Sequence, residues 1–202
     1  MNDLHEFLRT RRSVRSFAPD PVPQSVLERV LESACYAPSA HNRQPWRFVI
    51  VDGSQARKRL VKAMETDFYR DLQADDIPPI EISRRLERSR KRILTAPVAI
   101  VLCYDPGDMD VYSDPIRQQH ENTMGIQSTT LAGGTLLLAA HAEGLGGVWV
   151  CAPLFAAQAV RSSLAISASW QPQALLLLGY PLKQPETPLR RSLESLIYQV
   201  FE

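Results

Sequence analysis

Apolar residues recur at helical spacing along much of the chain. After the proline-rich "PDPVP", they occupy positions 26, 27, 30, 31, 34 and 35 and stop before Pro38, which predicts a helix with one buried face over 24–37. Further helices are predicted over 55–72, 81–94, 118–143 and 155–164. Small residues and leucines cover nearly every face of the inner part of the helix over 118–143, at 125–144, so we expect this part to be buried all round, in part by another chain.

Short runs of β-branched, aromatic and leucine residues alternate with these helices. They predict four strands, over 46–51, 96–104, 147–152 and 173–181. The last strand has apolar residues on both faces, as central strands do. This alternation predicts an α+β or α/β sandwich with one central sheet. We expect one domain over 1–202, with a proline-rich and charged extension over 181–202 that packs on the body or on a partner subunit.

Composition limits the class of partner. A chain of 202 residues that is 45% hydrophobic can bury a full core, and its net charge of +1 creates no long-range field of the kind that nucleic-acid or membrane-surface binders use. No signal pattern stands at the N-terminus, and His141 and Glu143 interrupt the most apolar stretch. We therefore expect a soluble cytoplasmic protein that binds neither nucleic acid nor membrane, with any anion site local.

Familiar catalytic motifs are missing from the sequence. The three cysteines, Cys35, Cys103 and Cys151, are widely spaced in apolar surroundings, which predicts reduced core thiols and no disulfide. The four histidines are scattered singly, so no metal site is expected. There is no dinucleotide fingerprint, P-loop or nucleophile elbow.

The stretch "RRSVRSF" is the first candidate binding element. It offers guanidinium forks, a hydroxyl and backbone donors within five residues, a set that suits a phosphate: Arg11, Arg12, Ser13 and Arg15. A second basic fork, Arg190 and Arg191, stands near the far end of the chain. The alternative for each is a solvated run of charge.

The stretch "APSAHNRQPW" is the second candidate. Ser39, Asn42 and Gln44 stand in a loop bounded by prolines, and side-chain amides two residues apart can donate to and accept from the edge of a flat heterocycle. The alternative is a helix-to-strand loop whose amides bond to its own backbone. Two distant basic elements and an amide loop together indicate one phosphate-bearing ring ligand.

Four motifs in order, "RRSVRSF", "APSAHNRQPWRFVIV", "GLGGVWV" and "GYP…PLRRSLE", resemble those of the FMN-dependent nitroreductase family. The resemblance runs from about Arg11 to Arg191. It implies an α+β, nitroreductase-like sandwich with a mixed central sheet flanked by helices, in an entwined homodimer with two flavin sites at the subunit interface. The segments 69–98 and 112–125 are similar to the nitroreductase-type C-terminal domain of the coenzyme F-420 gamma-glutamyl ligase.

The resemblance also implies which residues bind FMN. The phosphate and flavin-edge contacts would come from Arg11, Arg12, Ser13 and Arg15, joined by Arg190 or Arg191. A second subunit would contribute the loop residues Pro38, Ser39, Ala40, Asn42 and Gln44. A strand and its following backbone would lie against the isoalloxazine at Trp149, Val150, Cys151 and Ala152.

The function implied is oxidoreduction on flavin N5, which explains why no acid, base or nucleophile stands out. NADH, NADPH or a reduced flavin would be the donor in a ping-pong cycle, and a nitroaromatic, a quinone or a deazaflavin-coenzyme precursor the small-molecule acceptor. The alternatives are a flavin destructase and a flavin- or coenzyme F-420-binding module without turnover. A row of arginines either meets an anionic substrate tail or forms a solvated helix face: Arg84, Arg85, Arg88 and Arg92.

Overall fold

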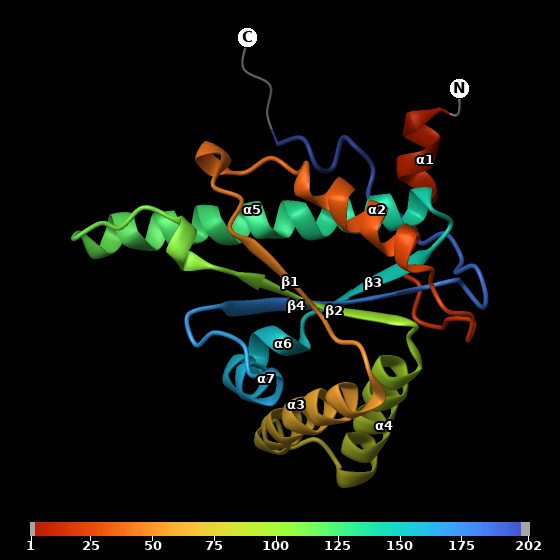
Figure 1. Cartoon of the computed structure of the whole chain (residues 1–202). Helices are drawn as coiled ribbons and strands as arrows, with labels where there is room; N and C mark the ends of the chain where they lie inside the picture. The colour runs from red at the N-terminus through yellow and green to blue at the C-terminus, as the bar shows by residue number, and fades with distance from the viewer. Residues whose placement is uncertain (1–2, 199–202) are drawn as a thin grey trace.

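A single sheet lies between two layers of helices in the computed structural model, which describes residues 3–198 (Figure 1). Its strands follow the order β1-β2-β4-β3: β1 (Trp46–Ile50), β2 (Val98–Tyr104), β4 (Gln171–Gly179) and β3 (Gly146–Val150). One face is covered by α2 (Gln24–Cys35) and α5 (Pro115–Ala142). The other is covered by α3 (Ser54–Ala74), α4 (Pro79–Thr95), α6 (Ala152–Phe155) and α7 (Ala157–Leu164). The remaining helices are α1 (Leu4–Thr10) and the 3-10 turns η1 (Ala40–Asn42) and η2 (Pro106–Asp108).

The α+β sandwich expected from the sequence is confirmed. All three strand pairs are antiparallel. Among residues 3–198, the parallel component of the expected mixed sheet is a single bridge between Ser13 and Gly147. This bridge places the segment that follows α1 beside the edge strand β3.

The two central strands divide the core into two clusters. On β2, Ala99, Val101 and Cys103 face the layer of α3 and α4, while Ile100 and Leu102 face α2 and α5. Strand β4 alternates in the same way, with its leucines fully buried on both faces, as the sequence predicted. Burial on both faces makes the sheet a rigid support for the segments at its ends and edge.

Element boundaries differ from the prediction around β3 and α7. The strand ends at Val150, and Cys151 is the N-cap of α6, because Pro153 in the first turn of that helix has no N–H for a strand ladder. Ala156, at φ −123°, then separates α6 from α7, so the single helix expected over 155–164 is two. Helix α3 begins at Ser54, one residue before the predicted start, and Gly53 at φ 84° is its N-cap.

Two glycines of α5 allow close packing against the sheet. A Cβ at Gly125 would lie 2.4 Å from the Tyr104 ring, and one at Gly133 would lie 2.4 Å from the Trp149 ring. Gly134 has no heavy atom within 4 Å of that position, and the neighbouring Leu131 is 50% exposed. Gly125 and Gly133 therefore pack closely on the sheet, whereas one face of α5, at Gly134, is open within a single chain.

The C-terminal segment is irregular from Leu182 onward and is described as far as Tyr198. The Leu182 N–H donates to the Ser16 carbonyl at 3.1 Å, and the Arg12 guanidinium donates to the Thr187 hydroxyl at 2.8 Å. Beyond these contacts Leu189 is 99% exposed. The last four residues of the expected extension lie outside the described part of the chain.

We predict unequal effects for alanine at the two adjacent glycines of α5. Gly133→Ala should destabilise the fold by about 1–3 kcal/mol, because the methyl group would overlap Trp149 and Leu102. Gly134→Ala should destabilise it less than Gly133→Ala, because no atom of the same chain lies within 4 Å of the added methyl group. Urea unfolding of both variants measures the difference; a Gly133→Ala protein as stable as wild type would contradict the packing described.

Candidate functional site

The basic segment, residues 11–15, is held against the edge of the sheet. The Val14 N–H donates to the Gly147 carbonyl at 3.0 Å, and Val14 is 2% exposed. A Cβ at Gly146 would lie 2.6 Å from the Val14 Cβ, so glycine is required for this approach. The flanking Arg11 and Ser13 are half-buried and Arg15 is exposed, which leaves their polar groups outside the core.

Positive charge gathers at Arg11 without a carboxylate. Burial lowers the pKa of the Arg11 guanidinium from its usual value, and the charges of Arg190 and Arg12 lower it further. Among residues 3–198, no acidic side chain lies within 4.0 Å of any of these three arginines. A surplus of this kind fits an anion that is held by more than one guanidinium.

Unlike Arg11, Arg12 uses its guanidinium group to bond to other parts of the chain. Its guanidinium donates to the Arg9 carbonyl, to the Arg11 carbonyl at 2.9 Å and to the Thr187 hydroxyl at 2.8 Å. Three of its donors therefore serve the chain itself. The contact with Thr187 ties the C-terminal segment, and with it Arg190, to the end of α1.

The amide loop, residues 38–44, is preshaped by unusual backbone angles. His41, Asn42 and Gln44 have φ of 50°, 55° and 51°, in the left-handed region that costs non-glycine residues free energy. The Ser39 hydroxyl accepts from the Gln44 N–H at 3.1 Å, and the Ala40 N–H donates to the Ser128 hydroxyl at 3.1 Å. The Gln44 side-chain amide also donates to the Asn42 carbonyl at 3.3 Å, so the amide-to-backbone bonding raised as the alternative from the sequence is present, but Asn42 and Gln44 remain exposed.

The amide loop and the basic segment lie at opposite ends of the sheet. Ser13 bridges to Gly147, which is level with Leu178 on β4, whereas Trp46, just after the loop, is level with Gln171 through Tyr104. Positions 171 and 178 are seven residues apart, which at about 3.3 Å per residue is roughly 23 Å. Pro38, Ser39, Ala40, Asn42 and Gln44 therefore do not join the arginines within one chain.

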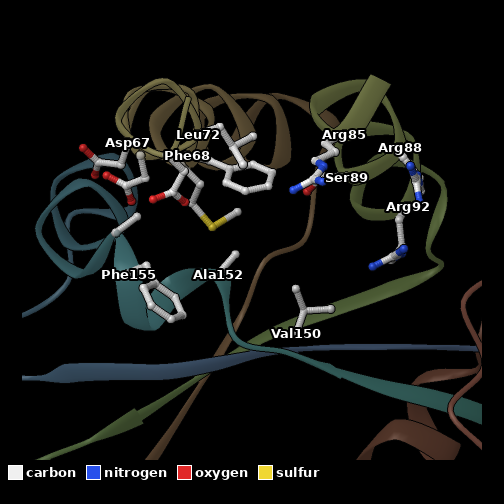
Figure 2. Close-up of a pocket in the computed structure, with 14 residues that line it drawn as sticks. Asp67, Phe68, Leu72, Arg85, Arg88, Ser89, Arg92, Val150, Ala152 and Phe155 are labelled. Carbon is white, nitrogen blue, oxygen red and sulfur yellow. The ribbon is translucent and has the colours of Figure 1, made fainter. Parts of the chain in front are cut away.

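The end of β3 opens onto a cavity of about 460 Å³ that lies between the sheet and the layer of α3 and α4 (Figure 2). Val150 and Ala152 line it, together with side chains of α3, α4 and α6. The pKa of Arg92, on its α4 wall, is lowered by burial and then by the charges of Arg15 and Arg88. The basic segment, the end of β3 and the arginines of α4 are therefore neighbours. The family resemblance in the sequence had already linked the basic segment to the end of β3. For the arginines of α4, the signal available in the sequence was their spacing along a helix, at positions 85, 88 and 92.

The cysteines correct one expectation. Cys103 is a buried core thiol, and burial raises its pKa to about 12. Cys35 and Cys151 are exposed, so the prediction of core thiols is wrong for these two, because each stands at a helix end and not inside the sheet. In the described part of the chain, the three cysteines are free, no cluster of metal-ligating side chains is present, and no helix is long and apolar enough to cross a bilayer.

Comparisons with known proteins agree with this architecture. The family model described as "Nitroreductase family" matches residues 8–180. A protein of Methanothermobacter thermautotrophicus, named as a candidate NADH dehydrogenase/NAD(P)H nitroreductase, is 30% identical over 189 residues, which cover 92% of this chain and 81% of that protein.

Two further likenesses extend over almost the whole chain. The 5,6-dimethylbenzimidazole synthase of Rhodospirillum rubrum is 32% identical over 203 residues, which cover 97% of this chain and 89% of that enzyme. The crystal structure of a candidate nitroreductase from Desulfovibrio desulfuricans, in complex with FMN, matches with a TM-score of 0.75 at 23% identity and covers 100% of this chain and 99% of that one. The structural likeness shows a shared fold.

The exposures of the cysteines predict their reactivity. In the folded, ligand-free protein at pH 8, iodoacetamide should alkylate Cys35 and Cys151 and leave Cys103 unmodified, because the buried thiol keeps its proton far above that pH. Peptide mass spectrometry after a time course reads each site, with urea-unfolded protein as the control in which all three react. Labelling of Cys103 at the rate of Cys151 would contradict the burial described.

Proposed function

Because the chain belongs to the nitroreductase family, we propose that it is an oxidoreductase that holds FMN and passes electrons from NADH or NADPH to an electron-poor small molecule. The observation that carries the proposal is the uncompensated positive charge of Arg11 and Arg190, at the segment that bridges to Gly147 at the start of β3. When bound, FMN supplies reversible two-electron chemistry, and the protein supplies its binding, orientation and electrostatics.

The proposed phosphate contacts are Arg11, Ser13 and Arg190. Two guanidinium groups and a hydroxyl match the charge and the acceptor oxygens of a phosphate. Arg190 is preferred over Arg191 because the charge of Arg190 is among the causes that lower the pKa of Arg11, and that of Arg191 is not. Arg12, whose donors serve its own backbone and Thr187, would position this set.

The proposed ring contacts are Trp149, Val150, Cys151 and Ala152. These residues run from the edge strand into α6, beside the cavity that Val150 and Ala152 line. Arg15 follows the phosphate contacts along the chain and would stabilise negative charge that develops on the ring during reduction. No protein acid or base is needed for that step.

A second copy of the chain would complete each site. The amide loop lies roughly 23 Å from the basic segment of its own chain along β4. The loop and the basic segment would therefore contact the same ligand only if they came from different subunits. The proposed loop contacts are Pro38, Ser39, Ala40, Asn42 and Gln44. The open face of α5 at Leu131 and Gly134 supports such a homodimer, because it exposes apolar and small residues.

The acceptor class stays broad: a nitroaromatic, a quinone or a deazaflavin-coenzyme precursor. The likeness to a 5,6-dimethylbenzimidazole synthase favours one second candidate, a flavin destructase, because dimethylbenzimidazole and the flavin share a dimethylbenzene ring. A flavin- or coenzyme F-420-binding module without turnover is the non-enzymatic alternative.

We predict that FMN binds and that Arg11 is needed for it. Titration of the purified protein with FMN should quench flavin fluorescence at saturation, and Arg11→Gln should raise Kd by roughly tenfold or more, because a charge-assisted contact with phosphate is lost. Arg59→Gln, an exposed arginine of α3, is the matched control and should leave Kd unchanged. Equal Kd values for wild type and Arg11→Gln would reject the phosphate assignment.

We also predict that a nicotinamide reduces the bound flavin. Anaerobic addition of NADH or NADPH should bleach the flavin band, and a nitroaromatic or a quinone should restore it, since ping-pong exchange uses one site for both. Product mass spectrometry in air separates the alternatives: intact FMN supports the reductase, and loss of FMN with release of a benzimidazole supports the destructase. A flavin that neither donor bleaches would remove the donor assignment.

A further inference from the structure

The cavity at the end of β3 has charges of opposite sign at its two ends. Figure 2 shows Arg85, Arg88 and Arg92 at one end, Asp67 at the other, and the apolar Phe68 and Leu72 between them. Asp71 and Asp75 also line this cavity. An apolar middle and two charged ends suit a flat ligand that carries a charge on one side.

The acidic end is partly neutralised by the protein. The Arg70 guanidinium lies 2.9 Å from a carboxylate oxygen of Asp67 and 3.2 Å from one of Asp71. A ligand cation would have to compete with Arg70 for both carboxylates. With three carboxylates, those of Asp67, Asp71 and Asp75, against the one guanidinium of Arg70, this end keeps a net negative charge and disfavours an anion.

The basic end keeps unpaired charge deep in the cavity and at its mouth. Arg85 and Arg84 share the Glu81 carboxylate, at 2.8 Å and 2.7 Å. Among residues 3–198, Arg88 and Arg92 have no carboxylate within 4.0 Å. The Ser89 hydroxyl lines the same end and adds a neutral donor.

The arginines form a row that leads away from the proposed flavin site. Arg92 is the member whose guanidinium feels the charges of both Arg15 and Arg88. Arg88 stands one turn earlier on α4, so it lies farther from the basic segment along the helix. A ligand in this cavity could reach Arg88 while its apolar part contacts Phe68 and Leu72.

We propose that this cavity selects electron acceptors with a carboxylate or phosphate group, which pairs with Arg88 while the acidic end fixes the orientation of the acceptor. The inference rests on the proposed function only in calling the ligand an electron acceptor; the preference for an anion follows from the charges of the cavity. The inference narrows the proposed acceptors to those that carry a negative charge.

The test measures binding to the oxidised, FMN-loaded protein by calorimetry, with 4-nitrobenzoate and 4-nitrotoluene as probes that differ by a carboxylate in place of a methyl group. Wild type should bind 4-nitrobenzoate more tightly. Arg88→Gln should weaken this binding roughly five- to tenfold, and added salt should reduce the preference. Arg84→Gln removes the same charge from an exposed position that does not line the cavity, and should leave the preference intact.

Several results would overturn the inference: equal binding of the two probes by wild type, no binding of 4-nitrobenzoate, or tighter binding of 4-nitrobenzylammonium than of 4-nitrobenzoate. Equal weakening by Arg88→Gln and Arg84→Gln, or by Arg88→Gln for both probes, would overturn it as well. Because the readout is equilibrium binding, failure of NADH and NADPH to reduce the flavin would remove the proposed function and leave the charge preference measured. A protein that holds no FMN is titrated as purified.

Discussion

The backbone contact between the basic segment and strand β3 is the constraint on which the rest of the site depends. It is possible only because Gly146 has no side chain: a Cβ there would lie 2.6 Å from Val14. The Val14–Gly147 hydrogen bond and the burial of Val14 hold the segment in place, so the alternate residues Ser13 and Arg15 present polar groups outward. The anion site is thus built on a rigid edge and not on a free loop.

The length of the sheet also determines which of the proposed flavin contacts one chain can bring together. Its strands separate the amide loop from the basic segment by roughly 23 Å along β4. Between these two ends, Val150 at the end of β3 is level with Leu175 on β4 and lines the cavity that α3 and α4 enclose. A single chain therefore offers the basic segment at one end of the sheet and the amide loop at the other, and the proposed two-fold arrangement would join them in one site.

Periodicity was sufficient for the sheet and for most helices, because β2 and β4 are buried on both faces and the helices are amphipathic. Periodicity did not predict the features that depend on contacts between distant parts of the chain. Nothing in the pattern distinguishes Gly133, packed on Trp149, from the open Gly134. The inward bonding of Arg12 and the positive φ angles of the amide loop depend on neighbours that a linear pattern does not contain. The pairing of Arg84 with Glu81, and the position of Arg88 on the cavity, likewise required the folded helix.

The central claim is that each flavin site draws its basic segment from one chain and its amide loop from another. Mixing two FMN-deficient variants, Arg11→Glu and the double variant Asn42→Ala, Gln44→Ala, after joint unfolding and refolding tests it directly. Random pairing gives mixed dimers in which one site carries both defects and the other carries none, so about one quarter of all sites should regain wild-type FMN affinity. A mixture that binds no more FMN than the two variants measured apart would contradict the account.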